Sequence, residues 1–103
     1  MITTHVLDTA QGKPACGIPG RLELREPQGW TPVGDGVTDA GGRLRTLVKS
    51  PLRAGTYRLT FETRARSAFF PEVSITFEVA DASAHYHLPL LLSPFGYSTY
   101  RGS

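Results

Sequence analysis

The sequence has little cysteine, no long apolar run and no large excess of charge of one sign. Its 103 residues include one cysteine, Cys16, so no disulfide can form within the chain and nothing indicates an oxidising compartment. No apolar stretch approaches the roughly 20 residues that cross a bilayer, and no charged-then-apolar leader precedes the first predicted strand. We therefore expect a cytoplasmic protein with no membrane contact.

The charge balance also argues against nucleic acid as a partner. Eleven Lys and Arg against nine Asp and Glu give a formal net charge of +2, and the basic residues are scattered along the chain. Nucleic-acid-binding domains usually gather such residues into a patch. The length predicts one domain, 1–103, and because so small a domain buries only about 60–70% of its surface, a deep pocket forms more easily between subunits.

Alternation of apolar and polar residues, punctuated by 11 Gly and 8 Pro, predicts β-structure throughout. Short strands at this spacing favour a sandwich of two antiparallel sheets. Turns are expected at 12–14, 34–36 and 39–42, and the only candidate helix is the single turn 64–68. The predicted strands are 2–7, 21–26, 30–33, 43–48, 56–63, 73–79, 85–91 and 96–100.

Three histidines lie on predicted strands. Alternation puts His5 on one strand face with Thr3 and Leu7, and puts His85 and His87 together on one face of a later strand. A lone strand histidine is more often structural than functional. A zinc site needs three or four ligands, often including cysteine, and the single cysteine lies in a distant turn, so we expect no metal.

The other candidates are an arginine and the last four residues. Arg43 follows Gly42 at a turn, where backbone can approach a ligand closely, and its planar fork suits a heterocycle rich in oxygen and nitrogen. Arg45 shares its strand face and is the fallback. Residues 100–103 offer a phenol, a guanidinium, a hydroxyl and a carboxylate. Because termini usually fray unless something holds them, we expect this segment to fold into a site.

Five segments carry a resemblance to a known family: 4–8, 12–15, 38–43, 69–72 and, most closely, 85–103. Together they resemble the 5-hydroxyisourate hydrolases, the transthyretin-related proteins of urate breakdown. The similarity covers nearly the whole chain in order. The terminal Tyr-Arg-Gly-Ser is the feature that separates these hydrolases from true transthyretins.

The resemblance implies an all-β, transthyretin-like sandwich of about eight strands with at most one short helix. It also implies a homotetramer, a dimer of dimers, with active sites at the dimer–dimer interface. The implied reaction is the hydrolysis of 5-hydroxyisourate to 2-oxo-4-hydroxy-4-carboxy-5-ureidoimidazoline, without a cofactor. Water attacks a ring carbonyl and the adjoining C–N bond opens. The chain has no Gly-flanked serine elbow that would indicate an acyl-enzyme instead.

The resemblance also assigns roles to residues of this chain. It predicts His5, Arg43, His87 and Ser103 as catalytic, with either histidine as the base, and His5, Arg43 and Tyr100 as substrate contacts. His85 is expected to be a neighbour of the site. The family commonly has an aspartate where Gly41 stands in this chain. The glycine is expected to loosen the loop before Arg43. The alternatives are a transthyretin-like carrier of a small ligand and an adhesive β-sandwich.

Overall fold

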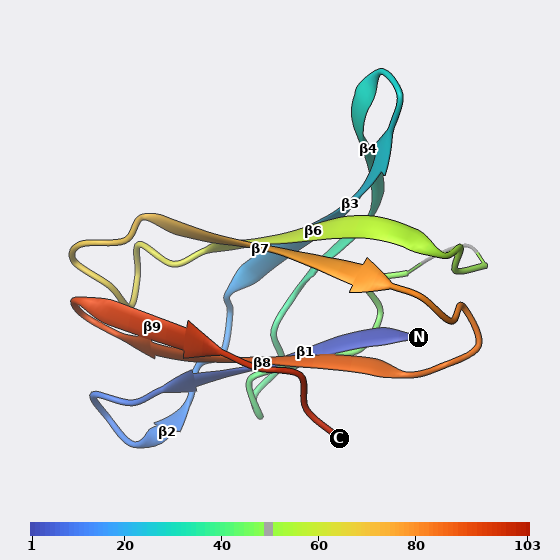
Figure 1. The fold of residues 1–103 in the computed structure, drawn as a ribbon. Coiled ribbons are helices and arrows are strands. Elements are labelled where there is room, and N and C mark those ends of the chain that lie inside the picture. The colour runs from blue at the N-terminus through green and yellow to red at the C-terminus, as the bar shows by residue number, and fades with distance from the viewer. Residues whose placement is uncertain (49–50) are drawn as a thin grey trace.

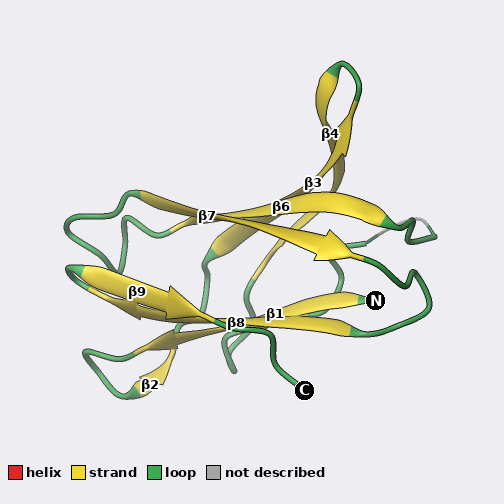
Figure 2. Cartoon of the chain, in the orientation of Figure 1, coloured by secondary structure: helices red, strands yellow, loops and turns green. Residues whose placement is uncertain are grey.

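The computed structural model describes residues 1–48 and 51–103, which form nine strands and no helix. Figure 2 shows these strands joined by loops. Their bounds are β1 (Ile2–Asp8), β2 (Lys13–Pro14), β3 (Pro19–Glu26), β4 (Gly29–Val37), β5 (Arg43–Leu44), β6 (Gly55–Glu62), β7 (Glu72–Val79), β8 (Tyr86–Ser93) and β9 (Gly96–Thr99).

The strands form two stacked sheets, so the predicted sandwich is confirmed (Figure 1). One sheet has the order β4-β3-β6-β7, with every pair antiparallel. In the other, β2 and β5 both pair with β1, which is followed by β8 and β9. The prediction of two purely antiparallel sheets is wrong in one pair, because β1 and β8 run parallel. Parallel neighbours need a long connection, and here nearly the whole chain lies between them.

Alternation along the strands fills the space between the sheets. Val6, Leu22, Leu59 and Leu90 come from four different strands, and each is 0% exposed. Burying such a side chain stabilises the fold by about 1.5–3 kcal/mol relative to leaving it in water. The intervening positions of β1 and β8 lie on the outer face of the five-stranded sheet, where the predicted site residues are found.

The predicted turn at 34–36 is wrong, because β4 continues through these residues. A Cβ on Gly34 would lie 1.4 Å from the carbonyl oxygen of Leu47, and one on Gly36 would lie 2.7 Å from Leu44 Cδ1. These glycines therefore allow the segment after β5 to cross β4 closely, a contact that local sequence does not reveal. The same crossing explains why the predicted strand 43–48 is reduced to Arg43–Leu44.

Two further differences concern short segments. The predicted break at 12–14 contains a two-residue strand, β2, paired with the end of β1. The candidate helix at 64–68 is a turn followed by a bend, in keeping with the expectation of at most one short helix. This loop is held by Arg66, whose guanidinium lies 3.0 Å from the buried carboxylate of Asp8. Asp8 thus braces a neighbouring segment.

Candidate functional site

The parallel pairing of β1 with β8 sets the geometry of the candidate site. Its register places Thr3 beside His87 and His5 beside Pro89 on the outer face of the sheet. On the other edge of β1, His5 pairs with Arg43 of β5. Three segments that are distant in sequence therefore bring two histidines and an arginine to one surface.

The hydroxyl of Thr3 lies between two imidazoles. Its Oγ1 is 2.8 Å from Nε2 of His85 and 2.8 Å from Nδ1 of His87. Thr3 is buried, at 6% exposure, whereas His85 is exposed and His87 is half-buried. This contact fixes the ring of His87 and leaves Nε2 as the ring nitrogen that Thr3 does not engage.

Residues 100–103, called the tail below, fold back onto His87. The N–H of Gly102 donates to the carbonyl of His87 at 2.8 Å, and the guanidinium of Arg101 lies 4.5 Å from the ring centre of Tyr86. A Cβ on Gly102 would come within 2.7 Å of His87 Cδ2, so only glycine fits here without displacement. Figure 1 shows the tail leaving the five-stranded sheet after β9, and Ser103 lies beside the site.

The loop before Arg43 is braced by Asp39. The Asp39 carboxylate accepts hydrogen bonds from the N–H groups of Gly41 and Arg43, both at 2.9 Å. The hydrogen bond from the Arg43 N–H lowers the pKa of Asp39. Desolvation opposes this effect and the hydrogen bond from the Gly41 N–H adds to it, so the pKa of Asp39 lies below its usual value. Gly42 has φ +75° and packs its backbone against Val6, whose N–H donates to the Gly42 carbonyl at 2.7 Å. Glycine at position 41 therefore does not leave this loop without a brace.

A cavity of about 350 Å³ opens between these groups. Its walls include Thr3, Arg43, Arg45, His85, His87 and Ser103. The structure thus brings three of the four predicted catalytic residues, Arg43, His87 and Ser103, to one cavity, with Arg45 as the predicted fallback beside them. Its size and its cationic, imidazole-rich wall suit a small anionic or carbonyl-rich ring.

His5 lies beside this cavity and is half-buried. Among the described residues, its Nε2 is the only buried side-chain nitrogen or oxygen without a hydrogen-bond partner. A buried imidazole nitrogen without a partner is uncommon in folded proteins, which marks His5 as a candidate for a functional role. His5 also contributes to the electrostatics of His87, so the two rings are near neighbours.

The surroundings of His87 favour its neutral form. Burial lowers the pKa of His87 below 6.5, and the charges of His85, Arg43 and His5 lower it further, against a smaller opposing contribution from Thr3. A neutral imidazole can accept a proton, so this environment prepares His87 to act as a base near neutral pH.

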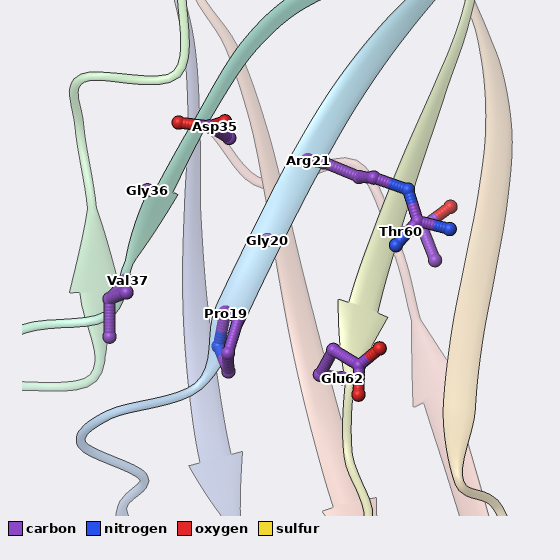
Figure 3. A pocket seen from close by; sticks show the side chains of 8 residues that line it. All are labelled: Pro19, Gly20, Arg21, Asp35, Gly36, Val37, Thr60 and Glu62. Atoms are coloured by element: carbon purple, nitrogen blue, oxygen red, sulfur yellow. The ribbon is translucent and has the colours of Figure 1, made fainter.

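The structure places Tyr100, the predicted substrate contact, away from this cavity. Tyr100 is 59% exposed and lines a second pocket, of about 240 Å³, with Phe77, Leu88 and Arg101 at the open edge between β7 and β9. A third pocket lies on the outer face of the four-stranded sheet, where Arg21, Asp35 and Glu62 project from three strands (Figure 3). Neither pocket contains the predicted catalytic residues.

Within residues 1–48 and 51–103, no group of three or more His, Cys, Asp or Glu side chains is placed to hold a metal ion. No helix in the same part of the chain is long and apolar enough to span a membrane. The side chains that line the cavity offer imidazole, guanidinium and hydroxyl groups.

Sequence reasoning missed three contributors to this geometry: Thr3, Asp39 and Gly102. Thr3 shares a strand face with His5, which was a usable signal, but its contact with His87 depends on pairing across the whole chain. Asp39 two residues before a glycine is a common turn-forming pattern. The need for glycine at position 102 has no local signal.

An all-β sandwich with this cavity on its outer face defines the structural class, and comparison with known proteins places the chain within it. A model of the HIUase/Transthyretin family matches residues 2–102, so the chain belongs to this family. It is 44% identical over 115 residues to the 5-hydroxyisourate hydrolase of Deinococcus radiodurans, covering 99% of this chain and 95% of that protein. The family resemblance drawn from sequence is confirmed.

Two solved structures extend this comparison. The 5-hydroxyisourate hydrolase of Klebsiella pneumoniae has a TM-score of 0.84 and 40% identity, covering 99% of this chain and 98% of that one. Transthyretin from Sparus aurata has a TM-score of 0.90 and 32% identity, covering 98% and 95%. Because the transthyretin is at least as similar in fold, the backbone alone does not separate a hydrolase from a transthyretin, and the site residues must do so.

Proposed function

We propose that the protein hydrolyses 5-hydroxyisourate to 2-oxo-4-hydroxy-4-carboxy-5-ureidoimidazoline, a step of urate breakdown. The observation that carries the proposal is the meeting of Arg43, His87 and Ser103 around one cavity. The 44% identity to a hydrolase along almost the full length of both proteins supports it independently. The substrate is a small purine-derived ring, which matches the size of the cavity.

His87 is the general base in this proposal. Its ring is held at Nδ1 by Thr3 and is flanked on the Cδ2 side by the Gly102 backbone. Nε2 then takes a proton from water as the oxygen attacks a ring carbonyl. General-base assistance of this kind contributes about 10²–10⁴-fold.

Arg43 and Ser103 bind the reacting groups. The guanidinium of Arg43 donates to the ring oxygens and stabilises the negative charge that develops on the attacked carbonyl. Ser103 lines the same cavity, and its hydroxyl orients the attacking water in this proposal. Asp39 holds the main chain of Arg43 in place through the N–H bond described above.

His5 is the donor to the departing nitrogen. Its buried Nε2 has no partner among the described residues, and the cross-strand pairing sets His5 next to Arg43. As an imidazolium, His5 would donate its Nε2 hydrogen to the departing nitrogen when the C–N bond opens, and it would be left as a neutral imidazole with its hydrogen on Nδ1. Tyr100 stays a predicted substrate contact, which its place in the edge pocket does not favour.

We also propose a homotetramer, a dimer of dimers, that closes the site. The outer face beside the cavity continues into half-buried Leu7 and Leu91 and buried Pro89, an apolar strip that a second copy would cover. The dimer–dimer interface then excludes water from the open cavity. Sedimentation of the pure protein as a monomer at micromolar concentration would count against this assembly. The cytoplasm is the proposed location, with which the exposed thiol of Cys16 is compatible, and cell fractionation checks it.

The test of the activity is the decay of freshly generated 5-hydroxyisourate, followed by absorbance with and without the purified protein. The protein should speed the decay well above the spontaneous rate, and His87→Ala should lose about 10²–10⁴-fold while keeping a folded circular dichroism spectrum. Decay at the spontaneous rate with the wild-type protein would overturn the proposal. Tight binding of a small apolar ligand in that case would favour the carrier.

A further inference from the structure

The contact of one threonine hydroxyl with two imidazoles has consequences beyond holding a ring. Thr3 Oγ1 lies 2.8 Å from both His85 Nε2 and His87 Nδ1, and the two ring centres are 6.3 Å apart. A hydroxyl has one hydrogen, so it donates to one nitrogen and accepts from the other. The protonation states of the two histidines are therefore coupled through Thr3.

Two arrangements of the hydrogens satisfy this geometry. In the first, His87 Nδ1–H donates to Thr3 and the hydroxyl donates to His85 Nε2, so His87 presents a lone pair at Nε2. In the second, His85 Nε2–H donates to Thr3 and the hydroxyl donates to His87 Nδ1, so His87 carries its hydrogen at Nε2. The bond made by one ring nitrogen decides the state of the other. Only the first arrangement makes His87 a base toward the cavity.

The surroundings determine which ring can carry an extra proton. His85 is exposed to water, whereas His87 is half-buried. A positive charge is better solvated on the exposed ring. Titratable or charged groups from several segments surround His87. The first segment gives the N-terminal amine of Met1 and the ring of His5, and the β5 region gives Arg43 and Arg45. His85 lies on the same segment as His87, and Ser103 carries the terminal carboxylate of the tail.

We propose that Thr3 and His85 are positioning residues that set the tautomer of His87 and carry away the proton it accepts. The inference rests on the proposed role of His87 as base. Thr3 holds the hydrogen of His87 on Nδ1 in the resting state, and His85 is the terminal acceptor. His85 thus acts through Thr3 and His87 rather than on the substrate.

The proton transfers balance without another reactant. Water gives a proton to His87 Nε2 as its oxygen bonds to the substrate carbonyl carbon. His87 Nδ1–H passes to Thr3 Oγ1, and the original hydroxyl hydrogen of Thr3 passes to His85 Nε2. His87 is then neutral with its hydrogen on Nε2, Thr3 is a hydroxyl again, and His85 is an imidazolium that releases a proton from Nδ1 to solvent. The resting arrangement returns when His87 Nε2–H gives its hydrogen to solvent, His85 Nδ1 takes one up from solvent, and the two hydrogens between the rings shift back through Thr3.

The first test reads the tautomer of His87 in the resting protein by ¹⁵N NMR, which needs no turnover. We expect hydrogen on Nδ1 in the wild type, and a shift toward hydrogen on Nε2 in Thr3→Val, which removes the hydroxyl at nearly constant shape. Thr3→Ser should recover the wild-type signal. The matched control is Thr9→Val, which removes a hydroxyl that bonds Leu92 O at 3.1 Å further along the same seam. A wild-type tautomer in Thr3→Val would overturn the inference.

The second test uses kcat and KM to separate the setting of the His87 tautomer from the removal of the proton that His87 accepts. Thr3→Val should lower kcat by roughly 10- to 100-fold with KM within about two-fold, because it withdraws part of the general-base contribution and no binding group. Thr3→Ser should recover most of that loss. His85→Gln can still accept the Thr3 hydrogen bond but cannot be protonated, so it should keep the tautomer and lower kcat by about ten-fold. An unchanged kcat in Thr3→Val or in His85→Gln would overturn the relay.

The two tests also distinguish failure of this inference from failure of the proposed activity. If the wild-type protein does not accelerate 5-hydroxyisourate decay, the activity fails, while the NMR comparison of wild type and Thr3→Val still decides whether Thr3 sets the tautomer. If the wild type is active and Thr3→Val is indistinguishable from it in both readouts, only the relay fails.

Discussion

Replacing Gly102 by alanine adds one methyl group against His87 at the site. The new Cβ would lie 2.7 Å from His87 Cδ2, and 3.4 Å from both His87 Cγ and the His87 carbonyl oxygen. The nearest pair must separate by roughly a further 0.7 Å to reach ordinary contact. The ring is held at Nδ1 by Thr3 and its main chain is paired in β8, so the tail is the part that moves.

The size of the effect follows from what the tail carries. Moving it weakens the hydrogen bond from Gly102 N–H to the His87 carbonyl, now 2.8 Å, which stabilises the fold by about 1 kcal/mol. It also draws Ser103 away from the cavity. Misplacement of a catalytic group by about 1 Å can cost around 10²-fold in rate. We therefore expect kcat to fall by roughly 10- to 100-fold, with Tm lowered by about 4–8 °C at most.

The assay is the absorbance decay of 5-hydroxyisourate together with thermal unfolding of the same samples. Gly96→Ala is the matched control, because its Cβ would meet Ser93 Oγ at 3.6 Å, an ordinary contact. It should leave kcat near the wild-type value. A Gly102→Ala protein with wild-type kcat would refute the reasoning that the tail must approach His87 so closely.

Three further outcomes are expected. Because the pKa of His87 lies below 6.5 and the base acts in its deprotonated form, the fall in kcat/KM at low pH should have its midpoint below pH 6.5; a midpoint above 6.5 would contradict this. Asp39→Ala removes the acceptor that braces the N–H of Arg43, so kcat/KM should fall roughly ten-fold, whereas Asp39→Asn, which keeps an oxygen there, should lose less. Arg66→Leu leaves the buried Asp8 without its ion-pair partner and should cost about 2 kcal/mol of unfolding free energy in denaturant titrations, with kcat per folded molecule unchanged.

The ion-pair prediction has a control within the same chain. Arg21 and Glu72 lie 3.7 Å apart with about half of each side chain exposed, at 51% and 55%. Surface pairs of this kind contribute about 0–1 kcal/mol. Arg21→Gln should therefore change the unfolding free energy far less than Arg66→Leu, and equal effects would show that the burial of Asp8 does not matter.

Local patterns were enough to predict the layers and most strand faces. Alternation correctly put His5 and Leu7 on one face of β1 and Val6 on the other, because the two-residue period of a strand needs no tertiary information. It failed at β4, where glycines that resemble a turn instead allow the main chain at Leu47 to pass close by. Glycine is used both to form tight turns and to allow another segment to approach closely, and the local sequence does not say which of these applies.

The site was less accessible to sequence reasoning than the fold. Family resemblance named His5, Arg43, His87 and Ser103, but their arrangement depends on contacts between residues more than 80 positions apart. The bridging role of Thr3 has no signature of its own, since a threonine on a strand face is unremarkable. Tyr100, which the resemblance implies as a substrate contact, lies in a different pocket.

The hydrophobic core and the candidate site depend on the same register. In the parallel pairing that sets Thr3 beside His87, Val6 lies beside Leu90, and both of these core residues are 0% exposed. A slip of one residue would turn every side chain of β1 to the opposite face, moving His5 inward and Val6 into water. The free energy of burying Val6 and Leu90 therefore opposes a one-residue slip, which would also take Thr3 away from His87. In this domain the core stabilises the fold and also keeps the two imidazoles within reach of one hydroxyl.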